Sequence, residues 1–141
     1  MQRSASASWT GGLKSGTGTI STQSGVLEKT QYGFNTRFEE GPGTNPEELI
    51  GAAHAGCFTM ALAAALEKEG MTAKNLHTRA AVTLEKMDGG FEIVAVHLDL
   101  LADIPGADPA AFEKIAYAAK ADCPVSKLLN ATITLSAKLK E

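Results

Sequence analysis

The chain has 141 residues, a formal net charge of −3, a hydrophobic content of 44% and only two cysteines. This length favours a single domain over residues 1–141, and the slightly acidic balance gives no electrostatic reason to expect a nucleic-acid partner. Two cysteines do not make a secreted disulfide framework, and residues 1–16 lack the continuous apolar run of a secretory signal, so the expected location is the cytoplasm.

The first third of the chain is predicted to contain short strands. Residues 1–30 are rich in Ser, Thr and Gly, and short strands are predicted over residues 6–9 and 16–21. Their low hydrophobicity favours an edge hairpin or a segment ordered by a partner. Residues 31–38 are predicted to form a third strand, with Phe34 and Phe38 on the same face. A loop over residues 39–44, which contains Pro and two Gly, then leads into the longest predicted element.

A long helix is predicted over residues 45–69. Asn45 is a suitable N-cap, Pro46 fits the first helical turn, and Glu48 stands where a capping-box partner would. Residues 49–66 carry no charge and are apolar almost all the way round, which predicts a helix buried on most faces. Because the stretch is mostly Ala and Gly, its hydrophobicity is weak, and a core helix is favoured over a membrane span.

The second half of the chain alternates strands and helices. Residues 76–101 are predicted to form a hairpin that turns at residues 88–90 (DGG), because both arms show period-two alternation. Helices are predicted over residues 108–121 and 123–129, and a last strand over residues 131–140. The expected fold class is therefore α+β, with an antiparallel sheet packed on the long central helix.

The two cysteines are the candidate nucleophiles. Cys57 lies in mid-helix, far from any helix terminus, so its thiolate would need a cationic neighbour, for which Arg37 is the best candidate. Cys123 is the predicted N-cap of a helix that begins at Pro124, where backbone N–H groups favour the anion. The alternatives are a small buried hydrophobe for Cys57, an ordinary polar cap with an inert thiol for Cys123 and a surface charge for Arg37. If the two sulfurs meet, they form a nucleophile and a resolving partner.

Glu47 is the carboxylate best placed to serve the helix face of Cys57. At about 100° per residue, Glu47 lies roughly 80° from Cys57 in projection and Glu48 roughly 180°. Ten helical residues span about 15 Å, too far for a contact within one helix. Glu47 could act through an intervening arginine, or from the antiparallel helix of a second subunit that crosses near the small residues 51–56. We favour the second route, which predicts a homodimer; the alternative role of Glu47 is compensation of the helix dipole.

A metal site is a competing interpretation of the same helix. His54 and Cys57 share a helix face through their H-x-x-C spacing, and His77, His97 or Cys123 could add ligands. No CxxC or HExxH spacing and no phosphate loop is present, so we expect neither a metal nor another cofactor.

Three segments of the chain closely resemble the OsmC/Ohr family of osmotically inducible and organic hydroperoxide resistance proteins. These are residues 32–38 (YGFNTRF), 43–62 (GTNPEELIGAAHAGCFTMAL) and 122–129 (DCPVSKLL), and their order and spacing match along essentially the whole chain. The first segment and the helix after it look more like the OsmC branch. The resemblance implies a thiol-dependent peroxidase for organic hydroperoxides, and less efficiently for hydrogen peroxide. It also implies an intertwined homodimer with active sites at the subunit interface.

The same resemblance implies a role for each candidate residue. Cys57 falls on the family's peroxidatic cysteine and Cys123 on its resolving cysteine, while Arg37 and Glu47 fall on the pair that activates the thiolate and positions the peroxide. The implied reductant is a dihydrolipoyl-type dithiol. Apolar neighbours that could line the access route and favour alkyl hydroperoxides are Phe34, Phe58, Met60 and Leu128, each of which could instead be plain core.

Two rival functions remain from the residues themselves. One is a non-catalytic α+β dimer that holds a small apolar ligand, with incidental cysteines. The other is a thiol–metal stress protein. Peroxide consumption that depends on Cys57 separates the peroxidase from both.

Overall fold

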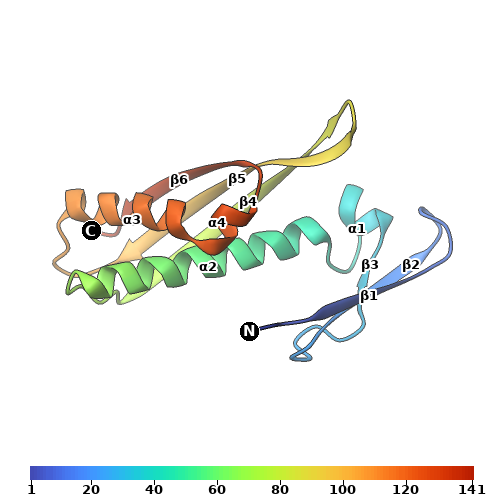
Figure 1. Ribbon diagram of the computed structural model, residues 1–141, viewed down its shortest axis with the longest axis horizontal. Coiled ribbons are helices and arrows are strands. Elements are labelled where there is room, and N and C mark those ends of the chain that lie inside the picture. Colours follow the sequence, from blue (N-terminus) through green and yellow to red (C-terminus); the bar gives the residue numbers. More distant parts are fainter. The chain divides into compact units, whose positions relative to one another are not determined.

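The computed structural model describes all residues from Met1 to Glu141. The chain divides into two compact units, Met1–Leu49 and Ile50–Glu141. Each unit contains its own three-stranded sheet, one built from β1, β2 and β3 and the other from β4, β5 and β6 (Figure 1).

The sheet of the N-terminal unit is antiparallel, in the order β1-β2-β3. Its strands are β1 (Ala5–Thr10), β2 (Thr17–Thr22) and β3 (Thr30–Tyr32). The predicted hairpin is confirmed, because β1 pairs with β2 along its whole length.

The predicted strand over residues 31–38 is wrong beyond Tyr32, where the chain forms the short helix α1 (Phe34–Phe38). The Thr36 hydroxyl accepts a hydrogen bond from the Gly33 N–H at 2.8 Å and donates to the Gly33 carbonyl at 2.9 Å, which closes a helical turn. Phe34 and Phe38 are four residues apart, a spacing that suits one helix face as well as one strand face. Their ring centroids lie 4.9 Å apart.

The long predicted helix is α2 (Pro46–Lys68). Asn45 is its N-cap as predicted, since its side-chain oxygen accepts from the Glu48 N–H at 2.8 Å. The capping box is only half formed, because the Glu48 carboxylate accepts from the Thr44 hydroxyl at 2.8 Å. Within the C-terminal unit the buried positions of α2 form one stripe, so the expectation of burial on most faces is wrong for the single chain. The stripe comprises Gly51, His54, Phe58, Leu62 and Leu66.

By length and composition α2 could cross a membrane, with a mean hydropathy of 1.7 over its most apolar window. One such helix is weak evidence for a membrane protein, because the core helix of a soluble domain meets the same criterion. In the single chain 28% of that window is buried, along the one face of α2 that packs into the core of the C-terminal unit.

The C-terminal unit has a mixed sheet in the order β4-β5-β6. β4 (Asn75–Met87) and β5 (Gly90–Asp103) form the predicted antiparallel hairpin, whose tip extends past β6 (Figure 1). β6 (Thr132–Leu139) pairs with β5 in parallel, so the expectation of a purely antiparallel sheet is wrong. The physical reason is the connection: α3 (Pro109–Asp122) and α4 (Pro124–Leu128) return the chain to the end where β5 began.

One face of this sheet carries the core. Inward-facing residues of β5 are fully or almost fully buried and pack against the buried stripe of α2 and against α3. Because all three elements share one continuous cluster, α2 and α3 cover the same face of the sheet. The largest members are Phe58, Leu62, Leu66, Leu98, Leu100 and Phe112.

Candidate functional site

The C-terminal unit brings the two cysteines into contact. Cys57 is half-buried on α2, and Cys123 is fully buried at the junction where α3 ends and α4 begins. Both are free thiols, and the side chain of Cys57 hydrogen-bonds that of Cys123. Two residues 66 positions apart in the sequence therefore lie within reach of a single disulfide bond.

The surroundings of the pair favour the anion on Cys123. Burial raises the pKa of the Cys57 thiol, and the hydrogen bond and charge of Cys123 raise it further, against a weaker opposing contact from the Val125 N–H. Burial also raises the pKa of Cys123. The hydrogen bonds that it receives from Cys57, Ser126 and Val125 outweigh burial and leave the pKa below its ordinary value. A thiolate on Cys57 therefore needs a positive charge that the C-terminal unit does not place beside it.

A buried histidine adjoins the cysteine pair. His54 lies one turn before Cys57 on α2, is fully buried, and places Nε2 at 2.7 Å from the Ser126 hydroxyl oxygen. Burial lowers the pKa of His54, which keeps its ring neutral at pH 7. The Nδ1 atom is buried and has no hydrogen-bond partner. The metal interpretation gave His54 a ligand role; here its Nε2 is taken by Ser126, and no group of three His, Cys, Asp or Glu side chains is arranged to hold a metal ion.

Arg37 and Glu47 form an ion pair in the N-terminal unit. Arg37 Nε donates to Glu47 Oε1 at 2.9 Å, and Nη2 lies 2.8 Å from the same oxygen. Two guanidinium nitrogens thus converge on one carboxylate oxygen, and Oε2 is buried without a partner. The Arg37 side chain is 39% exposed and that of Glu47 is 12% exposed. The pair orients the guanidinium and leaves part of it accessible.

An apolar cavity of about 300 Å³ lies beside the Arg37 guanidinium in the same unit. Of the apolar lining residues predicted from the sequence, only Phe34 lines this cavity. The available signal was compositional, since four of the eight aromatic residues of the chain occur within its first 38 positions. The cavity can hold an alkyl or aryl group next to a positive charge. Its main apolar lining residues are Trp9, Leu13, Tyr32, Phe34, Phe38 and Pro46.

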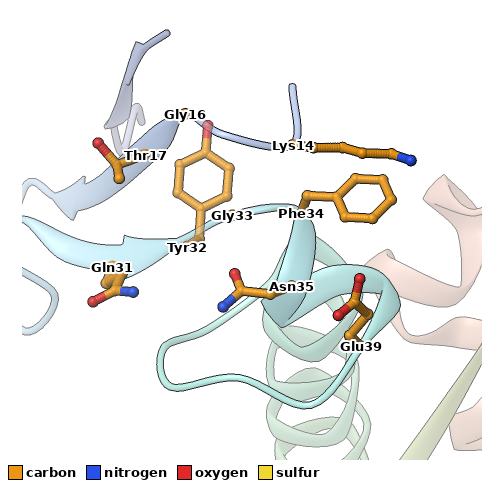
Figure 2. Close-up of a pocket in the computed structure, with 9 residues that line it drawn as sticks. All are labelled: Lys14, Gly16, Thr17, Gln31, Tyr32, Gly33, Phe34, Asn35 and Glu39. Atoms are coloured by element: carbon orange, nitrogen blue, oxygen red, sulfur yellow. The ribbon is translucent and has the colours of Figure 1, made fainter. Parts of the chain in front are cut away.

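A second cavity, of about 340 Å³, shares Tyr32, Gly33 and Phe34 with the first but has a more polar lining (Figure 2). Lys14 and Phe34 lie at one side of it, with the Lys14 ammonium 5.5 Å from the Phe34 ring centroid, while Gln31, Asn35 and Glu39 contribute polar groups. This lining suits an alkyl chain less well than the aromatic cavity does.

The other predicted lining residues lie in different settings. Phe58 is fully buried in the core of the C-terminal unit, next to Cys57 in sequence. Met60 on α2 is 76% exposed and Leu128 on α4 is 78% exposed. Helix α2, which carries Cys57, and helix α4, which begins directly after Cys123, therefore each carry a large apolar side chain open to solvent.

Comparison with known proteins gives the family. The model of the OsmC-like protein family matches residues 39–138, more than two thirds of the chain. The chain belongs to the OsmC-like protein family. Over 134 residues it is 53% identical to peroxiredoxin OsmC of Escherichia coli strain K12, covering 95% of this chain and 94% of that protein.

Solved structures of OsmC-like proteins agree with this fold. An organic hydroperoxide resistance protein OsmC from Legionella pneumophila has a TM-score of 0.69 at 25% identity, covering 96% of each chain. The organic hydroperoxide resistance protein OhrB of Bacillus subtilis has a TM-score of 0.67 at 26% identity, covering 97% of this chain and 98% of that one. The mixed α+β architecture is thus the one found in both the OsmC and Ohr proteins.

Proposed function

We propose that this OsmC-like protein is a cysteine-based peroxidase that reduces organic hydroperoxides to alcohols, and hydrogen peroxide less well. The observation that carries the proposal is the contact between the thiols of Cys57 and Cys123. The 53% identity to a peroxiredoxin supports the same activity. The chemistry needs a dithiol reductant of the dihydrolipoyl type, and we place it in the cytoplasm, where thiols persist.

The proposed cycle has three balanced steps. The Cys57 thiolate attacks the distal oxygen of the hydroperoxide; the O–O bond breaks, a sulfenic acid forms, and the alkoxide takes a proton to leave as the alcohol. The Cys123 thiolate then attacks the sulfenic sulfur, and the displaced hydroxide takes a proton to become water. The external dithiol reduces the Cys57–Cys123 disulfide by thiol–disulfide exchange and is itself oxidised to a disulfide.

Arg37 supplies the positive charge that Cys57 lacks in its own unit. A guanidinium beside the sulfur favours the thiolate and stabilises negative charge on the leaving oxygen. Glu47 holds that guanidinium through Oε1, so the two residues act as one group. Because they are ion-paired within one chain, whichever subunit supplies one of them supplies both.

We infer that this pair serves the Cys57 of a second subunit. Glu47 and Cys57 lie on the same helix α2, ten residues apart, which is about 15 Å of helix rise. The exposed face of α2 is uncharged along residues 52–64 and includes Gly56 and Met60. Small residues allow close helix crossing, and an exposed apolar face favours association. Sedimentation equilibrium should give two chains per particle; a monomer at micromolar concentration would contradict this arrangement.

The substrate's organic group would lie in the aromatic cavity beside Arg37, where Phe34 is one wall. Met60 and Leu128 would complete the access route from the cysteine side, and Phe58 would support the helix that carries Cys57. This assignment favours alkyl and aryl hydroperoxides over hydrogen peroxide, because only the former gain from apolar burial.

A coupled assay tests the function. With dihydrolipoamide as reductant, we expect kcat/KM for cumene hydroperoxide to exceed that for hydrogen peroxide by at least about tenfold, because burying a cumyl group gains more than 1.4 kcal/mol. Phe34→Ala should narrow that ratio and leave the hydrogen peroxide rate almost unchanged. Equal rates for both peroxides would refute the substrate assignment, and no turnover of either would refute the function.

A further inference from the structure

Helix α4 joins His54 to Cys123 through one hydroxyl group. Ser126 lies three residues after Cys123, in the first turn of α4. Its hydroxyl oxygen is 2.7 Å from His54 Nε2, and its hydroxyl and backbone N–H both lower the pKa of the adjacent Cys123 thiol as hydrogen-bond donors. The backbone N–H groups of Ser126 and Val125 also favour the anion, although Cys123 makes no capping hydrogen bond of standard geometry.

The single hydroxyl proton of Ser126 allows two arrangements. If neutral His54 carries its proton on Nδ1, then Nε2 accepts the Ser126 proton, Cys123 loses this donor, and a buried N–H at Nδ1 has no acceptor. If the proton is on Nε2, then Nε2–H donates to the Ser126 oxygen and the hydroxyl is free to donate to sulfur. The buried Nδ1 atom is then an unprotonated acceptor without a hydrogen-bond partner. Buried unpaired N–H groups are rare, so the network assigns the second arrangement.

We propose that His54 is a positioning residue which, as the Nε2–H tautomer, holds the Ser126 hydroxyl as a hydrogen-bond donor to the sulfur of Cys123. His54 does not touch the substrate or the reacting sulfur of Cys57 in this role. It acts through Ser126, and its full burial fixes the ring orientation that the hydroxyl needs.

The consequence for turnover rests on the proposed peroxidase function. Cys123 must be a thiolate when it attacks the Cys57 sulfenic acid, and a hydroxyl donor stabilises that thiolate before the attack. Loss of a hydrogen bond to a charged group lowers the thiolate population about tenfold at a pH below its midpoint. A more basic thiolate is also more nucleophilic, by about threefold for this change. The net effect expected on disulfide formation is therefore a slowing of about threefold.

The proton state of Cys123 can be read without any peroxide. In a Cys57→Ser background, Cys123 is the only thiol, and its thiolate absorbs near 240 nm. We expect added Ser126→Ala to move the titration midpoint to higher pH, with about tenfold less thiolate at a fixed lower pH. The matched control Ser126→Thr keeps the hydroxyl and should titrate like the background protein. Superimposable curves for the Ala and Thr variants would overturn the proposal.

The role of His54 is read by a second pair of variants. His54→Gln places an amide N–H about where Nε2–H lies and should keep the low midpoint, whereas His54→Leu should raise it. Equal midpoints for Gln and Leu would overturn the role of His54. If the Leu variant does not fold by circular dichroism, nitrogen-15 NMR of His54 in the folded parent decides, since Nδ1 protonation would overturn the proposal and Nε2 protonation supports it.

Turnover gives a separate readout in the protein with both cysteines. After one equivalent of cumene hydroperoxide, Ser126→Ala should lengthen the lifetime of the Cys57 sulfenic acid about threefold. The first step should not become slower, because a less charged Cys123 raises the pKa of Cys57 less. A slower first step instead would contradict an effect confined to Cys123. Failure of the protein to consume any peroxide would refute the proposed function while leaving the Cys123 titration intact.

Discussion

Replacement of Cys57 by Ser is expected to abolish hydroperoxide consumption, a loss of at least about 10⁴-fold. A serine hydroxyl is not ionised near pH 7 and cannot form the sulfenic acid, and the thiol that remains, Cys123, is fully buried. The measurement is the rate at which the reduced protein consumes cumene hydroperoxide in a single turnover.

Cys123→Ser is the matched control for this prediction. It removes the resolving thiol only, so the first attack should persist, and a sulfenic acid at Cys57 should be trapped by dimedone. Peroxide consumption that survives in Cys57→Ser but disappears in Cys123→Ser would reverse the assigned roles. The lower pKa of Cys123 in the isolated pair makes this reversal the alternative that matters most.

Arg37→Ala should slow the first attack by about 10²–10³-fold, the cost typical of removing one preorganised donor that faces developing charge. The pKa of Cys57 should also rise, because the guanidinium no longer offsets burial and the contact with Cys123, which both disfavour the thiolate. Stopped-flow consumption of cumene hydroperoxide gives the first quantity, and the pH dependence of Cys57 alkylation in a Cys123→Ser background gives the second. An unchanged alkylation profile would remove Arg37 from the role of activating cation.

Glu47→Gln is the control that separates charge from orientation. It keeps the shape of the side chain and loosens the Oε1 contact with both guanidinium nitrogens. We expect a smaller loss than for Arg37→Ala, on the order of tenfold, since the guanidinium remains but is less well oriented. A larger loss than that of Arg37→Ala would mean that Glu47 itself contacts the peroxide.

Mixed dimers test which subunit supplies the pair. When Arg37→Ala and Cys57→Ser chains are denatured together and refolded, the heterodimer has one complete site only if Arg37 serves the Cys57 of its partner. Under that arrangement about half of the mixed particles should be heterodimers, each with one working site. If activity stays at the level of the two separate variants, Arg37 acts within its own chain.

Local signals in the sequence predicted the elements whose energetics are local. The N-cap Asn45, the Pro-initiated helices α2, α3 and α4, and the DGG turn of the β4–β5 hairpin all lie where sequence patterns placed them. The helix α1 was missed because the spacing of Phe34 and Phe38 suits a strand and a helix equally, and the Thr36 hydrogen bonds to Gly33 decide between them.

Long-range features were less accessible. The direction of β6 depends on the path of α3 and α4 across the sheet, and alternation within β6 carries no information about it. Cys57 lies before the β4–β5 hairpin in the sequence and Cys123 lies after it, so residue spacing could not show whether the two thiols meet. Only the family resemblance predicted their contact. The link from His54 through Ser126 to Cys123 had no sequence signal, because a serine in a short helix is common and its partner lies 72 positions away.

Peptide mapping after treatment with one equivalent of cumene hydroperoxide is the most direct test that these two thiols form one redox unit. The reduced protein should lose both free thiols, and proteolysis should release a single disulfide-linked peptide pair that contains Cys57 and Cys123 of the same chain. A product with Cys57 oxidised and Cys123 still a free thiol, or with Cys57 joined to Cys57 of another chain, would contradict the account.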